Sequence, residues 1–182
     1  MTATQHTSRN ASSSHAVRWA LAGVTVAVLA ADQASKCLVM ATRIPGSISQ
    51  GTLSIGLVSN HGATMGAGAG SPVLVTLAAL AVAALAAAFA LRVTSRTAAL
   101  LLAAVFGGAL GNLADRLLRA PGIGTGGVVD WIHLNLAGHG VSLNIADLAI
   151  QLGVPAAIAV VLIASRHTAK SHQPATATLA TA

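Results

Sequence analysis

Long apolar stretches alternate with shorter polar segments along the chain. The four long apolar stretches are Val17–Met40, Pro72–Leu91, Ala98–Leu118 and Ile145–Ala164. About twenty predominantly apolar residues in a helix suffice to cross the hydrocarbon core of a bilayer. The pattern therefore predicts an all-α membrane protein with four transmembrane helices.

Two longer segments separate the spans, Ala41–Ser71 and Arg119–Leu143. In the first of them Leu53, Ile55 and Leu57 alternate with smaller or polar residues, which is the period of a half-buried strand. We therefore expect a small extracytoplasmic β-sheet region on the membrane surface.

The two ends of the chain are polar and rich in Ser, Thr and Ala. Such composition is typical of disordered tails, which we expect at 1–16 and 166–182 around one membrane domain at 17–165. An alternative for the first apolar stretch is a cleaved signal peptide, because Arg18 precedes its apolar core. The three later spans favour a retained helix instead.

The composition agrees with a membrane protein, since 54% of the residues are hydrophobic and 8% are charged. Aromatic residues are scarce, so helix contacts should be close and made by small side chains. The net charge of +6 is spread along the chain, which argues against a nucleic-acid surface. The single cysteine, Cys37, excludes an internal disulfide.

The distribution of Lys and Arg predicts the orientation in the membrane, because cytoplasmic segments carry more of them. The two larger loops hold Arg43 and Arg119. Both ends and the turn between the second and third spans should then be cytoplasmic. These segments contain Arg9, Arg18, Arg92, Arg96, Arg166 and Lys170.

In that orientation all four acidic residues fall at the outer end of the protein. They are Asp32, Asp115, Asp130 and Asp147, and the chain has no Glu. A carboxylate at the edge of hydrocarbon is costly and suggests a functional site. Asp130 and Asp147 bracket one segment, and two carboxylates that meet can share a proton and act on a water as acid and base.

Other polar residues near the outer end suggest supporting roles. Asp32 and Lys36 are four residues apart on one helix face, which fits either an ion pair or a direct catalytic role. Asn144 stands three residues before Asp147, in the position of a helix N-cap. We interpret Asp115, next to Arg116, as part of an ion pair at a helix end.

The third span ends with a four-residue repeat of Gly108, Asn112 and Arg116, which places all three on one helix face. This face should turn inward, because a lipid-facing Asn and Arg would be expensive. The spacing of His61, His133 and His139 matches no zinc site, so no metal is expected.

Five segments in order resemble the motifs of the bacterial lipoprotein signal peptidase (signal peptidase II) family. The resemblance covers nearly the whole chain except its tails. The segments are Asp32-Gln33-Ala34-Ser35-Lys36, Asn60-His61-Gly62-Ala63, the block from Gly107 to Arg116, Val128-Val129-Asp130-Trp131-Ile132, and Asn144-Ile145-Ala146-Asp147.

The resemblance implies an aspartic endopeptidase of the bacterial inner membrane, with Asp130 and Asp147 as catalytic residues. Its substrate would be a prolipoprotein whose cysteine carries diacylglycerol, cut just before that cysteine. It implies membrane lipid as a partner, no cofactor and no nucleic acid, and we expect a monomer. Asp32 and Lys36 would hold the site's architecture. Side-chain donors to the substrate would be Asn60, Asn112, Arg116 and Asn144.

The chain departs from the family pattern at Thr64-Met65, where Ala-Phe is usual, and at Trp131, where Phe is common. It also has Leu143 where Phe is frequent and Leu148 where Ser is frequent. These positions concern the packing of lipid and peptide, and so substrate preference rather than the reaction.

Two other functions compete with a peptidase. A small transporter or channel would use the carboxylates as a proton relay, which requires acids spread through the depth of the membrane. A non-catalytic assembly protein would explain the small residues of the spans but not the paired aspartates.

Overall fold

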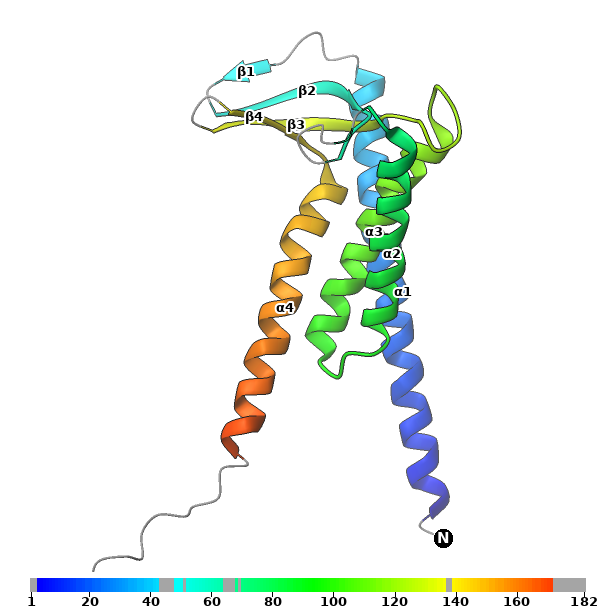
Figure 1. Ribbon diagram of the computed structural model, residues 1–182. Helices are drawn as coiled ribbons and strands as arrows, with labels where there is room; N and C mark the ends of the chain where they lie inside the picture. Colours follow the sequence, from blue (N-terminus) through cyan, green and yellow to red (C-terminus); the bar gives the residue numbers. More distant parts are fainter. Residues whose placement is uncertain are drawn as a thin grey trace, which may run out of the picture.

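The protein folds as a bundle of four helices with a sheet across one end, as the computed structural model in Figure 1 shows. The structure describes residues 3–42, 48–50, 52–63, 68, 70–136 and 139–171. The helices are α1 (Ala3–Thr42), α2 (Pro72–Ala90), α3 (Arg96–Leu118) and α4 (Ile145–Ser171). Four described helices are long and apolar enough to cross a membrane, which confirms the predicted class.

Helix α3 is the centre of the bundle and packs against each of the other three helices. Figure 1 shows α1 and α4 diverging from one another away from the sheet. In the described ranges, α2 makes little direct contact with α1 or with α4. The arrangement of the bundle therefore depends mainly on the faces of α3.

Three glycines of α3 allow this close packing. A Cβ atom on Gly107 would lie 2.6 Å from the carbonyl oxygen of Thr25 in α1. A Cβ atom on Gly108 would lie 2.7 Å from the carbonyl oxygen of Ala146 in α4. One on Gly111 would lie 2.5 Å from a carboxylate oxygen of Asp32. Glycine is needed at these positions because any side chain would push a neighbouring helix away.

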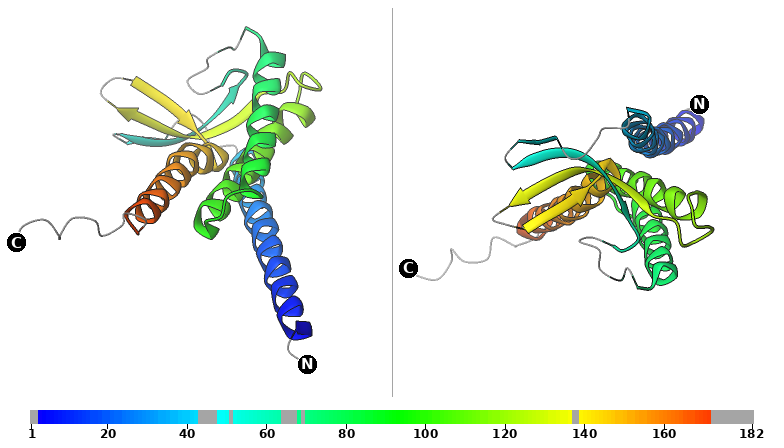
Figure 2. Two further views of the ribbon diagram at one scale, coloured as in Figure 1. Left: turned by 60° about the horizontal axis from the view of Figure 1, so that its bottom comes forward. Right: turned by 90° about the horizontal axis from the view of Figure 1, so that it is seen from above.

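The sheet has four antiparallel strands in the order β1-β2-β3-β4. They are β1 (Ile48–Gln50), β2 (Leu53–Asn60), β3 (Val128–Leu136) and β4 (His139–Leu143). Figure 2 shows the strands extending over the start of α4. The predicted sheet region is confirmed, and its β3–β4 hairpin is a finding beyond the strand that the sequence pattern predicted.

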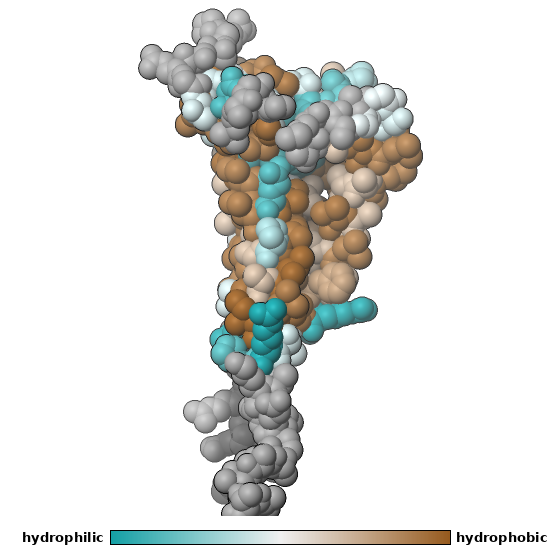
Figure 3. All heavy atoms as spheres, turned by 60° about the vertical axis from the view of Figure 1, so that its left-hand side comes forward, coloured by the Kyte–Doolittle hydropathy of each residue, from teal (hydrophilic) through white to brown (hydrophobic). Residues whose placement is uncertain are grey.

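The surface of the bundle has the hydropathy of a membrane protein. Figure 3 shows a broad apolar band along the helices, with hydrophilic residues gathered toward its two ends. Large apolar side chains are exposed on the band, among them Leu74 on α2 and Leu152 on α4. These side chains would face hydrocarbon, where their exposure costs nothing.

Helices α1 and α4 are longer than the spans predicted for them. Helix α1 begins at Ala3, inside the segment that we expected to be a disordered tail. The sequence offers no stop signal there, since neither Pro nor Gly occurs before Gly23 and alanine favours helix. Helix α4 continues to Ser171, and the rest of the second predicted tail, 172–182, lies outside the described residues.

The close approach at Gly108 leads to a stability prediction. Replacing Gly108 with Leu should force α3 and α4 apart, because the new Cβ would meet backbone of α4. Overpacking of this kind costs about 1–3 kcal/mol, a fall in the melting temperature of roughly 2–12 °C. Thermal unfolding in detergent measures it.

The matched control is Gly23→Leu, the same change in α1 at a position where a Cβ atom would meet nothing within 4 Å. Gly23→Leu should leave the melting temperature nearly unchanged. An equal loss in both variants would show that the added bulk, and not the α3–α4 contact, lowers stability.

Candidate active site

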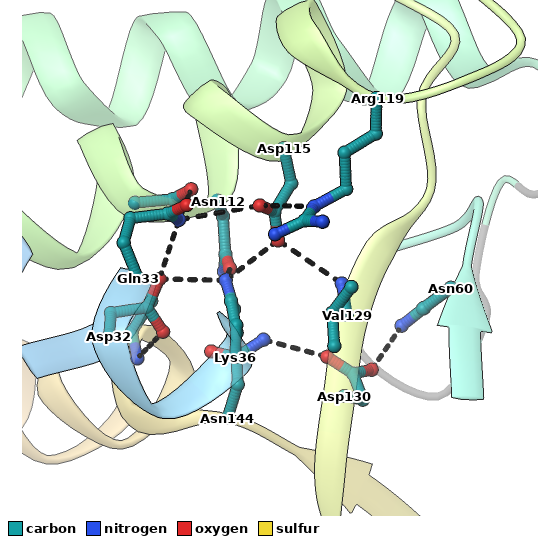
Figure 4. A network of polar contacts seen from close by, with 12 residues as sticks. Asp32, Gln33, Lys36, Asn60, Asn112, Asp115, Arg119, Val129, Asp130 and Asn144 are labelled. Carbon is teal, nitrogen blue, oxygen red and sulfur yellow. Dashed lines mark hydrogen bonds and ion pairs between the residues drawn. The ribbon is translucent and has the colours of Figure 1, made fainter. Parts of the chain in front are cut away.

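A fully buried lysine organises the polar residues at the sheet end of the bundle. The ammonium of Lys36 in α1 lies 2.7 Å from a carboxylate oxygen of Asp32 and 2.9 Å from one of Asp115 in α3. It also donates to the side-chain oxygen of Asn112 over 3.0 Å. Figure 4 shows this network between the helices. An ammonium has three N–H donors, so the three partners use all of them.

The two carboxylates that hold Lys36 also fix backbone from other elements. Asp32 accepts a hydrogen bond of 3.0 Å from the backbone N–H of Ala146 in the first turn of α4. Asp115 accepts one of 3.1 Å from the backbone N–H of Val129 in β3. The ion pair expected between Asp32 and Lys36 is therefore present, and it connects α1, α3, α4 and the sheet.

Asp115 forms an ion pair at a helix end, as expected, but its partner is not the adjacent Arg116. Asp115 pairs with Lys36 and, over 2.7 Å, with Arg119. Neighbouring residues of a helix point in different directions, whereas Asp115 and Arg119 are four apart and share a face. Gln33 of α1, for which we expected no role, also donates its side-chain amide to Asp115 over 3.3 Å. The i,i+4 spacing in the sequence is the signal that could have identified Arg119 as a partner of Asp115.

Asp130 lies in β3 with its side chain buried, 1% exposed. Its carboxylate accepts hydrogen bonds from the side-chain amides of Asn60, at 3.0 Å, and Asn144, at 2.7 Å. The sheet register explains both contacts: Val58 pairs with Asp130, and Leu143 pairs with Ile132. Asn60, the last residue of β2, and Asn144, just after β4, thus come to lie beside Asp130.

The pKa of Asp130 is raised to about 6, mainly by burial and in addition by the negative charge of Asp147. The hydrogen bond from Asn60 acts in the opposite direction. Desolvation disfavours the charged form of a carboxyl group and a nearby like charge does the same. Asp130 can therefore hold a proton at a pH near neutrality, unlike an ordinary aspartate.

Asp147 stands in the first turn of α4 and is held by a second pair of donors. One carboxylate oxygen accepts a hydrogen bond of 2.8 Å from the side-chain amide of Asn112, and the other accepts one of 3.3 Å from the backbone N–H of Asn144. In return, the side-chain oxygen of Asn144 accepts the backbone N–H of Asp147 over 2.9 Å. Asn144 is therefore the N-cap that the sequence predicts, and it also contacts both aspartates.

Asp130 and Asp147 line the same cavity of about 380 Å³ between α2, α3, α4 and the sheet. Asn60, Asn112 and Arg116 line it as well, while Asn144 lies buried behind the two aspartates. The structure thus brings the four suggested donors to the two aspartates, whereas Asp32, Lys36 and Gly108 do not line the cavity. Apolar side chains of α2, Leu74 to Val82, form the opposite wall.

Arg116 fixes the loop that follows β2. Its guanidinium donates to the backbone carbonyls of His61, at 3.5 Å, and Gly62. The loop is further held by the side-chain oxygen of Asn60, which accepts the N–H of Gly62 over 2.9 Å. Arg116 therefore positions Asn60 at Asp130 and contributes a wall of the cavity.

A second, apolar cavity continues from the first along the bundle. Its volume is about 570 Å³, it lies between α2, α3 and α4, and Val82 lines both cavities. Phe89 of α2 and Ile158 of α4 belong to its lining. A furrow of this kind suits a long apolar group that reaches the two aspartates from the bilayer.

Known proteins share the sequence pattern and the fold of this chain. Residues 24–163 match the family model described as signal peptidase (SPase) II. The chain is 34% identical over 139 residues to the lipoprotein signal peptidase of Bifidobacterium adolescentis, covering 74% of this chain and 72% of that protein. It is 37% identical over 146 residues to that of Rhodococcus jostii, covering 79% and 71% of the two chains.

The fold also resembles a solved structure titled a bacterial membrane enzyme structure by the in meso method at 2.3 Å resolution. The TM-score is 0.66 at 25% sequence identity, and the match covers 87% of this chain and 94% of the other.

The buried network predicts that Lys36 is essential for stability. In Lys36→Met, Asp32 and Asp115 would lose the cation that balances them, although Asp115 keeps Arg119. Removing one partner of a buried ion pair costs about 3–5 kcal/mol. Denaturant or thermal unfolding in detergent should show this loss.

The matched control is Arg119→Met, which removes the other cation from Asp115. The side chain of Arg119 is 25% exposed, and partly solvated pairs contribute about 0–1 kcal/mol. Equal losses in the two variants would contradict the central position given to Lys36.

Proposed function

The chain belongs to the signal peptidase II family, and we propose that it works as an aspartic endopeptidase with Asp130 and Asp147 as its catalytic pair. Family membership makes it a multi-pass peptidase of the bacterial inner membrane that removes signal peptides from prolipoproteins. The observation that carries the proposal is that the two carboxylates line one cavity and share Asn144 as a partner.

The proposed reaction uses one proton held by the pair. One carboxylate removes a proton from a water molecule, which attacks the scissile carbonyl carbon, while the other carboxyl group donates a hydrogen bond to the carbonyl oxygen. The proton taken from the water then passes to the leaving nitrogen as the C–N bond breaks, so the pair again holds one proton. The raised pKa of Asp130, about 6, favours Asp130 as the protonated partner. Asp147, with both oxygens held by hydrogen bonds, is then oriented to act as the base.

The hydrogen-bond donors to the pair support this chemistry because they are neutral. Asn60, Asn112 and Asn144 hold the carboxylates in place without bringing a formal charge to them. A cation in direct contact would favour the ionised form of both groups. The nearest ammonium, that of Lys36, instead contacts Asn112 and two other aspartates.

The shape of the cavities supports a lipid-modified substrate. The cavity at the aspartates and the apolar cavity between α2 and α4 share Val82 in their linings. We propose that the scissile bond, just before a diacylglyceryl-modified cysteine, lies at the aspartates. The acyl chains or the apolar signal segment then occupy the furrow.

A transporter with a proton relay fits the structure less well. All four aspartates lie at the sheet end of the bundle, where Asp32 and Asp115 are joined through Lys36. The aspartates thus leave the remaining depth of the bundle without carboxylates, whereas a relay needs acids through that depth.

The catalytic pair is tested by Asp130→Asn and Asp147→Asn. Each substitution should lower the rate of cleavage of a lipidated precursor by about 10²–10⁴-fold or more. Asn keeps the shape of the aspartate side chain but cannot accept or donate the catalytic proton. Cleavage is measured in liposomes against both a diacylglyceryl-modified precursor and its unmodified form. The unmodified form should remain uncut by the unchanged protein.

The control is Ser142→Ala, which changes another residue of the cavity lining. The hydroxyl of Ser142 lies 2.7 Å from a ring nitrogen of His133 and has no part in the proposed reaction. Near-normal turnover in either aspartate variant, or loss of turnover in Ser142→Ala with a folded protein, would refute the assignment.

We further propose that both ends of the chain are cytoplasmic and that the sheet and the aspartates lie at the outer face. The Lys/Arg asymmetry of the sequence supports this orientation, and the start of α1 and the end of α4 lie on the same side of the bundle (Figure 1). After Ser171, a reporter that works only in the cytoplasm should be active and one that works only outside the membrane should be inactive. After Gly140 the result should be the reverse. The opposite pattern would place the site on the wrong side.

A further inference from the structure

The end of the bundle remote from the aspartates carries positive charge without a carboxylate to balance it. Arg18 of α1, Arg92 of the turn after α2 and Arg96 at the start of α3 belong to this end. The chain has only four acidic side chains, and all of them stand at the sheet end. No side-chain carboxylate of this protein can therefore neutralise these arginines.

Two of the three arginines line one cavity. Arg18 and Arg96 enclose, with Val17, Leu91 and Thr94, a space of about 790 Å³ where the turn between α2 and α3 passes α1. Arg96 is the first residue of α3, and Ser95 is its N-cap, whose hydroxyl accepts the N–H of Ala98 over 3.4 Å. The N-terminus of a helix adds positive potential to that of the side chains.

The basic cavity leads into an apolar one. A second space of about 330 Å³ shares Arg18, Leu21, Ala90 and Leu91 with the first and continues along α1, α2 and α3 to Phe106. The one hydroxyl in its lining, that of Thr25, is already engaged, since it donates to the carbonyl of Ala103 over 3.1 Å. An occupant of this space therefore needs an apolar group.

We propose that the two cavities bind one anionic glycerophospholipid, with its phosphate between Arg18 and Arg96 and an acyl chain in the apolar cavity. A free phosphate would meet the charge but leave the apolar cavity empty. A zwitterionic lipid would fill that cavity but bring a cation of its own to the arginines. In the proposed orientation the lipid belongs to the inner leaflet, away from the catalytic pair.

The bound lipid would connect parts of the bundle that hardly touch. In the described ranges α1 and α2 make little direct contact, whereas both line the two cavities. A lipid in this position packs against both helices and the turn after α2. Its binding should therefore raise the thermal stability of the protein.

The test titrates the full chain, delipidated in a non-ionic detergent, with phosphatidylglycerol, phosphatidylcholine or glycerol 3-phosphate. Bound lipid is counted by native mass spectrometry, and the melting temperature is measured in parallel. We expect one phosphatidylglycerol to be retained and to raise the melting temperature. Phosphatidylcholine and glycerol 3-phosphate should do neither at equal concentration.

Three variants locate the site. The double variant Arg18→Gln/Arg96→Gln should weaken phosphatidylglycerol binding about 30-fold, from about 5-fold for each arginine near an anionic headgroup. Arg92→Gln removes the same charge from the neighbouring turn at an exposed residue outside both linings, and should bind normally. Ala22→Trp, at an exposed position of α1 that lines the apolar cavity, should block the acyl chain while both arginines remain.

Circular dichroism and gel filtration establish that each variant is folded. Equal binding of phosphatidylcholine would overturn the charge requirement, and equal binding of glycerol 3-phosphate would overturn the lipid requirement. A loss in Arg92→Gln as large as in the double variant would mean diffuse attraction to anionic lipid and no specific site. None of these outcomes depends on the proposed catalytic pair.

Discussion

The buried ammonium of Lys36 is the contact on which the site depends. Its charge is satisfied by Asp32 in the same helix and by Asp115 in α3. Each of these carboxylates in turn accepts a backbone N–H from another element, α4 for Asp32 and β3 for Asp115. A buried charge that is only partly paired would be strongly destabilising. The requirement to pair Lys36 therefore fixes how three helices and the sheet meet.

Because Lys36 is satisfied in this way, its ammonium contacts the catalytic pair only indirectly, through the neutral amide of Asn112. The oxygen of Asn112 accepts from Lys36, so the other end of the same amide must donate, and it donates to Asp147. This chain of two hydrogen bonds orients Asn112 without a cation next to the carboxylate. Asp130 likewise receives only amide donors. The site thus separates two carboxylates that are paired with a cation, Asp32 and Asp115, from two that accept hydrogen bonds only from neutral donors, Asp130 and Asp147.

Much of this arrangement could be predicted from the sequence, since the four spans follow from apolar length and the acidic cluster from the Lys/Arg asymmetry. The pairing of Asp32 with Lys36 follows from helical spacing. The hairpin of β3 and β4 was harder to predict. Strand β3 lies between β2 and β4 and against the bundle, so Val128 and Val129 are buried in succession. No alternation of apolar and polar residues therefore marks the start of this strand in the sequence. Of the partners of Asp115, Arg119 follows from helical spacing, whereas Lys36 required knowledge of how α1 and α3 cross. The Gly111 contact that brings these two helices together is visible only in three dimensions.

The other three helices pack mainly on α3, which explains why the bundle has open furrows at both ends. Helices α2 and α4 each pack on α3 but hardly on each other, so their facing apolar side chains enclose a cavity that leads to the aspartates. In water such a gap would close or fill with other side chains, because exposed apolar surface is costly. In a bilayer, acyl chains fill it at little cost, and an apolar substrate segment can replace them. A helix arrangement in which α2 and α4 pack mainly on α3 therefore leaves room for substrate without an unfilled core.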